Sequence, residues 1–586
     1  MTKSINLRLS LASLVVVLCV TPARAAPPGL STIVPPVLQR GVANDVRVFG
    51  KELARETELI LPFATEIKGG GNSLESASFT IQPHKEVPLG VYPVRVRTPD
   101  GVSNLRLIAV TDVPVVRVRE PNGRYRVGAL DLELVQPIQW PCIIVGDRLE
   151  RDIDAFRFTV KEGDRLTFVT ETWRLGLTPD PLIRLRDARG KILAYAHDTP
   201  TLQRDERLDH KFARSGEHLL EMQSTGGAGW TNHYLVKVGP LNYARAVFPL
   251  GGRRGQNVEV SVIDRDGQST TVRTRVPDDP WQDQWRLRLP DLPGSLDWPM
   301  ASGDFPEVME ETTHTNPQLV TWPVTINGRI SKPEESDLYR VAVKPGQTLR
   351  VRVDAFGLGS PLDGVLLVSD STSKKLLAQH DDQIYRGLPD PALDFEVPDG
   401  VSEVIIALHD TLQRGGLEFG YRLTIEQGGP DFLLWLGRKQ HPTNEEDVGW
   451  HRLDKSDTLS LTPGQEAKLR LSVRRTKKDD DPYYNGPVQG YAGPIHIKAE
   501  QLPTGVTVKP CVIAQGQTEA ELVIVAADDA PREPFEIAVV GEGTRFDGTI
   551  IRRVAERRLY LSDPQMAHLP WNWRVTKVAC VTTQPR

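Results

Sequence analysis

A pattern of alternating apolar and polar residues occurs twice in the chain. Residues 153–170 (IDAFRFTVKEGDRLTFVT) and 336–353 (SDLYRVAVKPGQTLRVRV) align along their whole length. In both, apolar side chains occupy every second position on either side of a turn that contains a glycine, Gly163 or Gly346. Period-two alternation is typical of a strand with one buried face, and a slip of one residue would turn that face to water. The two segments therefore predict the same β-hairpin, formed twice.

The correspondence continues beyond the hairpin in both directions. Upstream, Trp140-Pro141 corresponds to Trp322-Pro323, and downstream Tyr234 corresponds to Tyr421. Each copy spans roughly 105–115 residues of short strands, which is the size of one β-sandwich domain. The offset between the copies drifts slightly, as loop insertions in homologous sandwiches would cause.

Several motifs in these copies are similar to those of the bacterial pre-peptidase C-terminal (PPC) domain. They are a D-x-[FY]-R strand in both copies, 120–122 (EPN) before the first copy, and 359–363 (GSPLD), 380–382 (HDD) and 420–423 (GYRL) in the second. The first copy lacks the GSPLD and paired-Asp forms, and the second has 310–312 (EET) near the place expected for EPN. The resemblance implies a secreted, jelly-roll-like β-sandwich that is usually non-catalytic and appended to other domains.

A shorter repeat stands in front of each copy. Residues 33–41 (IVPPVLQRG) correspond to 247–255 (VFPLGGRRG), and an alternating strand follows each of them. The first of these, together with 90–104 (GVYPVRVRTPDGVSN), resembles the IPT/TIG type of immunoglobulin-like domain. A last module shows the short, regularly spaced strands expected of a further immunoglobulin-like sandwich.

These patterns predict an all-β chain of tandem β-sandwich domains, both immunoglobulin-like and jelly-roll-like. The predicted divisions are a signal peptide (1–25), an IPT/TIG-like sandwich (26–113), the first PPC-like copy (114–240), a divergent immunoglobulin-like module (241–312), the second PPC-like copy (313–428), an immunoglobulin-like sandwich (429–562) and a C-terminal tail (563–586).

The N-terminal residues have the composition of a secretory signal. Lys3 and Arg8 form a basic start that precedes the apolar run 9–20 (LSLASLVVVLCV). Residues 23–25 (ARA) then offer small residues at a cleavage site. The run is too short for an ordinary membrane span, and no later segment is apolar for about 18 residues. We expect cleavage after Ala25 and a secreted protein, in the periplasm or at the cell surface, without a membrane span after cleavage.

The charge balance is mildly acidic, with 71 Lys and Arg against 76 Asp and Glu. Charges of both signs are mixed along the chain, so the electrostatic footprint of a nucleic-acid-binding protein is missing. We expect a protein or polysaccharide partner from the cell envelope or extracellular matrix, and no nucleic acid.

Three cysteines remain after the signal peptide: Cys142, Cys511 and Cys580. An oxidising compartment allows one disulfide and one free thiol, with Cys511–Cys580 the favoured pair. The alternative is that all three are small buried apolar residues. No CxxC is present, so neither a zinc motif nor a redox motif is supported.

Catalytic and phosphate-binding motifs are absent from the sequence, which contains no GxSxG, HExxH or GxxxxGK[ST]. We therefore predict no enzyme activity and no cofactor other than calcium. The calcium candidates are Asp363, Asp381, Asp382 and Asp394, which recur around loops of the second copy and offer the oxygen ligands that a hard cation needs. The competing interpretation is that these residues cap turns through hydrogen bonds to the backbone.

Two further groups of residues allow weaker hypotheses. The histidines of the first copy, whose spacing matches no zinc motif, are His197, His210, His218 and His233. The tryptophans that could stack on sugars, but more often fill cores or seams between domains, are Trp281, Trp285, Trp298, Trp571 and Trp573.

Together these features predict a secreted, non-catalytic, multidomain binding or scaffold protein of the cell envelope. Its contacts would lie on sandwich surfaces and loops, and modules in series would give it reach. The alternatives are an accessory protein of a secreted hydrolase or peptidase system and a glycan-binding protein.

Overall fold

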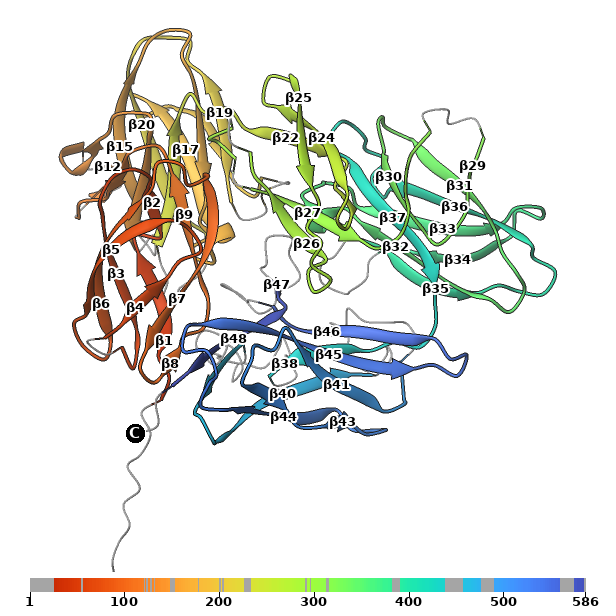
Figure 1. The fold of residues 1–586 in the computed structure, drawn as a ribbon. Helices are drawn as coiled ribbons and strands as arrows, with labels where there is room; N and C mark the ends of the chain where they lie inside the picture. Colours follow the sequence, from red (N-terminus) through yellow and green to blue (C-terminus); the bar gives the residue numbers. More distant parts are fainter. Residues whose placement is uncertain are drawn as a thin grey trace, which may run out of the picture.

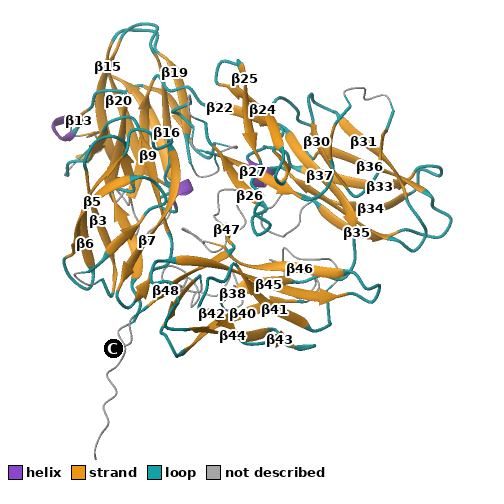
Figure 2. Ribbon diagram, in the orientation of Figure 1, coloured by secondary structure: helices purple, strands orange, loops and turns teal. Residues whose placement is uncertain are grey.

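The computed structural model describes residues 26–583 with internal gaps. The gaps are 54–55, 121, 123–124, 127–128, 131, 148–152, 178, 200–201, 203–204, 226–232, 290–291, 296, 312–315, 382–389, 438–456, 476–489 and 559–573. The regular structure of the described residues is β-strand with three short 3-10 helices, and it forms β-sandwiches in series, as predicted (Figure 2). The expected signal peptide lies outside the described residues. In the described part of the chain, no helix has the length and apolar composition that a membrane crossing needs.

Sandwich 1 comprises residues 29–111. One sheet has the order β1-β3-β6-β5, and the other has the order β2-β9-β7-β4 with β8 paired to β7. The alternating residues Val46 and Val48 are buried in its core beside Phe79 and Ile81. The strands are β1 (Gly29–Val34), β2 (Val37–Gln39), β3 (Asn44–Lys51), β4 (Glu58–Ile60), β5 (Thr65–Gly71), β6 (Ser76–Pro83), β7 (Gly90–Thr98), β8 (Gly101–Val102) and β9 (Arg106–Thr111).

Sandwich 2 comprises residues 115–239, and its two sheets have the orders β10-β14-β21-β16-β19 and β13-β15-β20-β17-β18. Phe156, Phe158 and Phe168 of the repeated hairpin are buried in its core, as the alternation predicts. The elements are β10 (Val115–Arg117), β11 (Tyr125–Arg126), β12 (Ala129–Leu130), η1 (Leu132–Leu134), β13 (Gln136–Pro137), β14 (Cys142–Asp147), β15 (Ile153–Val160), β16 (Arg165–Thr170), η2 (Trp173–Leu175), β17 (Pro181–Asp187), β18 (Ile192–Ala196), β19 (Arg207–Lys211), β20 (Gly216–Ser224) and β21 (His233–Gly239).

Sandwich 3 is the smallest and comprises residues 244–303, with the sheets β22-β24-β25 and β23-β27-β26. Its β24–β25 turn depends on Gly267, whose φ of +81° favours glycine, and on Asp264, whose side chain accepts hydrogen bonds from the amides of Asp266 and Gln268. The strands are β22 (Ala244–Phe248), β23 (Gly251–Arg253), β24 (Asn257–Asp264), β25 (Ser269–Arg275), β26 (Gln284–Leu287) and β27 (Trp298–Gly303).

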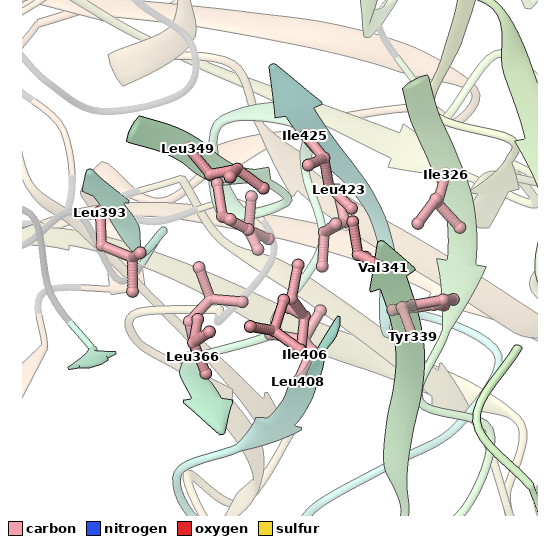
Figure 3. Close-up of a cluster of buried hydrophobic side chains, with 14 of the residues drawn as sticks. Ile326, Tyr339, Val341, Leu349, Leu366, Leu393, Ile406, Leu408, Leu423 and Ile425 are labelled. Carbon is pink, nitrogen blue, oxygen red and sulfur yellow. The ribbon is translucent and has the colours of Figure 1, made fainter. Parts of the chain in front are cut away.

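Sandwich 4 comprises residues 307–427 and repeats the topology of sandwich 2, with the sheets β28-β30-β37-β32-β35 and β29-β31-β36-β33-β34. Figure 3 shows its core, in which Tyr339, Val341 and Leu349 of the repeated hairpin point toward the opposite sheet. The elements are β28 (Glu307–Met309), β29 (Gln318–Val320), β30 (Val324–Arg329), β31 (Ser336–Ala342), β32 (Thr348–Asp354), η3 (Phe356–Leu358), β33 (Gly364–Asp370), β34 (Leu376–His380), β35 (Ala392–Glu396), β36 (Glu403–Asp410) and β37 (Gly420–Gln427).

Sandwich 5 comprises residues 433–582. Its strands form one continuous set that closes over a single core. β48 pairs with both β39 and β45, so the segment 563–586, expected to be a tail, supplies a strand of this sandwich. The strands are β38 (Leu433–Leu436), β39 (Thr458–Leu461), β40 (Glu466–Arg474), β41 (Ile495–Glu500), β42 (Val506–Val508), β43 (Cys511–Ile513), β44 (Glu519–Ala526), β45 (Phe535–Thr544), β46 (Ile550–Arg558), β47 (Arg574–Val575) and β48 (Lys577–Thr582).

The five sandwiches form a closed arrangement rather than an extended row (Figure 1). Sandwich 5 packs on sandwich 1, where Val102 meets Ala579 and Val581, and also on sandwich 3, where Trp281 meets Val540. The reach expected of modules in series is therefore not what the structure has. Apolar side chains at both contacts explain why the chain folds back, since each contact removes apolar surface from water.

The three cysteines in the described part of the chain are free thiols, so the favoured Cys511–Cys580 disulfide is not formed. Cys142 and Cys580 are buried among apolar residues, and burial raises the pKa of each thiol to about 12. The alternative interpretation, small buried apolar residues, is confirmed for these two. Cys511 is partly buried on β43.

Candidate functional site

Two of the predicted calcium residues, Asp363 and Asp381, lie at one end of the β33–β34 region, and the strand registers identify their counterparts in sandwich 2. The pairing of β33 with β34 and β36, and of β17 with β18 and β20, equates Asp363 with Asp180. The same registers equate Asp381 with His197. The two copies thus carry ligand-type side chains at the same place.

In sandwich 2 these positions form a compact group. Ligand atoms of Asp180, His197 and Asp198 all lie within 4.8 Å of one another. The His197 ring is 3.4 Å from an Asp198 carboxylate oxygen through Nδ1 and 3.0 Å from the Thr225 hydroxyl through Nε2. An imidazole with two carboxylates is a mixed ligand set that suits zinc better than calcium.

In sandwich 4 the counterpart group contains Asp363 and Asp381, while Asp382 lies outside the described residues. Burial raises the pKa of Asp363, and the nearby charges of Asp410 and Asp381 raise it further. Asp410 is already held by Arg414, whose Nη2 lies 2.8 Å from Oδ1. A cation held by Asp363 and Asp381 would relieve the remaining repulsion, so calcium at this end of sandwich 4 stays a prediction.

Asp394 does not belong to this group. It lies on β35, in the sheet opposite β33 and β34, and its two carboxylate oxygens each accept a hydrogen bond of 2.7 Å from Arg350. In sandwich 2 the counterpart of Asp394 is Asp209, which pairs with Arg165 from a position two residues before the counterpart of Arg350, Thr167. The structure therefore does not bring the four predicted residues together, because Asp394 is bound to an arginine in the opposite sheet.

A second carboxylate group was missed by the sequence analysis. Ligand atoms of Glu310, Glu335 and Asp337 lie within 4.8 Å of one another, and the last two residues are buried. Burial raises the pKa of Asp337 to about 8, and the charge of Glu310 contributes. Carboxylates this close must share a proton or a cation. The sequence placed Glu310 near the position expected for the EPN motif, but the strand registers equate it with Val118 of sandwich 2.

A buried tyrosine holds this group in position. The Tyr421 hydroxyl donates a hydrogen bond of 2.6 Å to Asp337, and the Tyr234 hydroxyl donates one of 2.5 Å to Asp154 in sandwich 2. Gly328 leaves room for the Tyr421 ring, since a Cβ there would lie 2.2 Å from the hydroxyl oxygen. The D-x-[FY]-R motif therefore positions an aspartate for a tyrosine hydroxyl in both copies.

Other aspartates cap turns, as the competing interpretation proposed, although they are not the four predicted residues. Asp390 accepts hydrogen bonds from the amides of Ala355, Phe356 and Gly357 at 2.8 to 3.2 Å, at the start of η3. Burial raises the pKa of Asp390 to about 7 despite these donors. Asp205 caps η2 in the same way in sandwich 2.

The remaining candidate residues have structural roles where they are described. His210 and His218 pack edge-on against Phe212, with ring centroids 4.8 and 4.7 Å apart. Trp298 lies in the seam between sandwiches 3 and 4, where its Nε1 donates to the Leu358 carbonyl at 2.9 Å. Trp571 and Trp573 lie outside the described residues. For Trp298, the seam interpretation is confirmed.

Buried ion pairs tie the two ends of the chain together. Arg95 of sandwich 1 lies 2.6 Å from one carboxylate oxygen of Asp457, which precedes β39, and Arg557 of sandwich 5 contacts the other oxygen. Asp457 is completely buried. Burial raises its pKa, but the charges of Arg95 and Arg557 outweigh that effect and hold the pKa below its usual value. Asp457 is therefore a charged carboxylate that is buried between sandwiches 1 and 5 and paired with two arginines.

Further contacts join the other sandwiches. Asp431 accepts from Arg350 of sandwich 4 at 2.8 Å and contacts Arg553 of sandwich 5. Lys577 of sandwich 5 lies 2.7 Å from Asp279 of sandwich 3. Because sandwich 5 contacts sandwiches 1 and 3 as well as its chain neighbour, sandwich 4, the arrangement cannot flex at one linker without breaking contacts elsewhere.

Comparisons with known proteins add little to this geometry. No family model and no curated protein matches the chain. Among solved structures, the pre-peptidase C-terminal domain of a Bacillus anthracis collagenase is 12% identical, covers 21% of this chain and 100% of its own, and has a TM-score of 0.15. A tetra-tandem repeat from the extending region of a large adhesion protein is 9% identical, with 89% and 97% covered and a TM-score of 0.12. The protein SGBP-B from a Bacteroides ovatus mixed-linkage glucan utilization locus, in complex with a heptasaccharide, is 8% identical, with 66% and 71% covered and a TM-score of 0.12. Scores this low carry no argument, so the PPC and IPT/TIG resemblances stay predictions.

Proposed function

We propose that this chain is a secreted, non-catalytic binding or scaffold protein of the cell envelope that acts as one rigid body. The observation that carries the proposal is the closure through Asp457, which joins sandwich 1 to sandwich 5. Modules joined by flexible linkers would span a long distance. A closed arrangement instead keeps loops of different sandwiches at fixed distances and orientations. Surfaces held in this way bind at a lower cost in conformational entropy.

The recognition elements that we propose are apolar side chains on protruding loops. Phe546 is fully exposed at the tip of the β45–β46 hairpin, and Ile550 at its end is 66% exposed. Arg545 anchors this hairpin, because its Nε donates to the Pro430 carbonyl at 2.8 Å. Exposed apolar residues at constrained positions are typical of surfaces that meet a partner.

A pull-down tests this proposal. The mature chain, residues 26–586, is immobilised and exposed to cell-envelope protein and polysaccharide fractions. We expect recovery of a specific component, and loss of that recovery in the double variant Phe546→Ser/Ile550→Ser. Leu74→Ser, which removes an exposed leucine from sandwich 1, is the matched control and should leave recovery unchanged. Recovery of nothing by the unaltered chain would count against a binding role.

A second proposal concerns calcium. Two groups of described carboxylates favour it: Glu310, Glu335 and Asp337, and the pair Asp363 and Asp381. A cation at either place would stabilise sandwich 4 rather than take part in a reaction. If so, a chelator should lower the melting temperature of the mature chain, and calcium should restore it. An unchanged melting temperature under both conditions would contradict calcium binding.

A further inference from the structure

A cavity lies where sandwiches 2, 3 and 4 meet. Its volume is about 270 Å³, which is just below the range of about 300–1,000 Å³ typical of sites for drug-sized ligands. Its lining comes from all three sandwiches and consists of Thr199, Arg207, Tyr243, Arg245, Pro361, Glu418 and Phe419. Junctions between domains are common places for small-molecule sites, because side chains from separate units converge there.

Arg207 is the unusual member of this lining. Its guanidinium carbon lies 3.9 Å from the centroid of the Tyr243 ring, so the cation is stacked on an aromatic face. No carboxylate among the described residues forms an ion pair with it, and Asp209, whose charge acts on it, is bound to Arg165. Burial lowers the pKa of Arg207 to about 10, which still leaves it charged at neutral pH. A partly buried cation without a counter-ion favours the arrival of an anion.

The other charged groups of the lining define the anion more closely. Arg245 pairs with Glu418, so these two cancel and the lining carries one net positive charge, that of Arg207. A single carboxylate would balance that charge, whereas a phosphate monoester, with close to two negative charges at neutral pH, would exceed it and be repelled by Glu418. Glu418 can in addition accept hydrogen bonds from hydroxyl groups of the ligand.

Apolar surface completes the site. Pro361 and Phe419 come from sandwich 4 and face the same space as the arginines of sandwiches 2 and 3. A sugar ring has apolar C–H faces that pack on such side chains while its hydroxyl groups reach polar partners. A peptide C-terminus would also supply a carboxylate, but it lacks the several hydroxyl groups that suit Glu418.

We propose that this cavity binds one sugar-acid unit, with the carboxylate on Arg207 and the hydroxyl groups toward Glu418. The site would accept a uronic-acid residue, either free or within an acidic polysaccharide. Binding would bridge three sandwiches, so it would also strengthen the closed arrangement. The proposal does not depend on the apolar hairpin tip described above, and either can fail while the other stands.

The test is a calorimetric titration of the mature chain with four probes: glucuronate, glucose, cyclohexanecarboxylate and N-acetylalanine. We expect glucuronate to bind at least tenfold more tightly than the other three. Glucose lacks the carboxylate, cyclohexanecarboxylate lacks the hydroxyl groups, and N-acetylalanine represents a peptide C-terminus. Equal binding of N-acetylalanine would overturn the sugar assignment in favour of a peptide, and no binding of any probe would overturn the site. An oligoglucuronate in a parallel titration then distinguishes a polysaccharide source from the free sugar acid.

Two variants locate the binding. Arg207→Gln should weaken glucuronate binding by about 10- to 100-fold, which is the range for a charge-assisted hydrogen-bonded pair. Glu418→Gln should reduce the preference for glucuronate over cyclohexanecarboxylate, because it removes the acceptor for the hydroxyl groups. Arg340→Gln is the matched control, since Arg340 is a half-exposed arginine on β31 away from the cavity lining. Melting curves show whether each variant is folded. Unchanged affinity in a folded Arg207→Gln variant would contradict the proposal.

Discussion

Sandwiches 2 and 4 share one topology but differ in the charges that their equivalent positions hold. Both place an aspartate under a buried tyrosine hydroxyl, Asp154 with Tyr234 and Asp337 with Tyr421. In sandwich 4, however, Glu310 and Glu335 lie close to Asp337. Burial raises the pKa of Asp337, and the charges of these two carboxylates raise it further. The alternation of apolar residues therefore determines the sandwich fold of both copies. Substitutions at a few polar positions determine what each copy can bind.

The largest difference between the copies should appear when the arginine that pairs with the corresponding aspartate, Asp394 or Asp209, is replaced. Arg350→Gln leaves Asp394 buried without its partner and should cost about 3–5 kcal/mol. Arg165→Gln removes a pair that is much more exposed, and it should cost about 1 kcal/mol or less. Denaturant-dependent hydrogen exchange measures the free energy of unfolding of each sandwich separately. Equal costs would mean that burial does not distinguish the two pairs.

The aspartate that caps η3, Asp390, should make the stability of sandwich 4 depend on pH. Asp205 contacts the Arg174 side chain as well as backbone amides, whereas the described partners of Asp390 are amides alone. The pKa of Asp390 is about 7 in the folded protein and near 3.8 in an unfolded chain, so the folded state binds more protons between these values. The contribution of Asp390 to the free energy of unfolding of sandwich 4 should therefore fall as pH rises from about 4 to about 7, by at most about 1.4 kcal/mol per pH unit.

Asp390→Asn checks this prediction, because asparagine keeps an oxygen acceptor for the amides but does not titrate. Hydrogen exchange at a series of pH values, corrected for the intrinsic exchange rate, should show a flatter profile for the variant than for the unaltered chain. A profile that keeps its slope would assign the pH dependence to another group.

The sequence predicted the parts of the fold that depend on local periodicity. Phe156 and Tyr339 could be assigned to buried faces because apolar residues recur at every second position around them. The closure at Asp457 could not be predicted, since its partner Arg95 stands 362 residues away and nothing local marks either residue. The same reason hid Glu310 as a neighbour of Asp337, because only the folded sheet brings them together.

The prediction for the calcium residues failed for Asp394 on similar grounds. Recurring aspartates in loops suggest oxygen ligands, but the sequence does not tell which of them an arginine already binds. Arg350 stands 44 positions before Asp394, on the neighbouring strand β32, and the pairing of β32 with β35 brings them into contact.

Both copies should lose a similar amount of stability when the glycine that faces the buried tyrosine is replaced by alanine. A Cβ on Gly146 would lie 2.2 Å from the Tyr234 ring, and one on Gly328 would lie 2.2 Å from Tyr421. Each glycine-to-alanine variant should destabilise its own sandwich by about 1–3 kcal/mol, because the tyrosine must leave its position under the aspartate. Gly357→Ala, with its nearest contact at 3.6 Å, is the control. Tolerance of one substitution but not the other would show that only one copy depends on the tyrosine contact.

The smallest effect should come from removing divalent cations, and it should separate the copies most cleanly. Calcium at ten times its Kd would stabilise the state that binds it by about 1.4 kcal/mol. Hydrogen exchange in the presence and absence of a chelator should show this gain in peptides from 307–342 of sandwich 4, where Glu310, Glu335 and Asp337 meet. The equivalent part of sandwich 2 should change less, since Asn122 there accepts a backbone hydrogen bond instead of adding a charge. Asp337→Asn should remove the calcium effect in sandwich 4 and leave sandwich 2 as it was. An equal response in both copies would mean that the cation binds at a feature that they share. The additional carboxylates of sandwich 4 would then share protons instead of a cation.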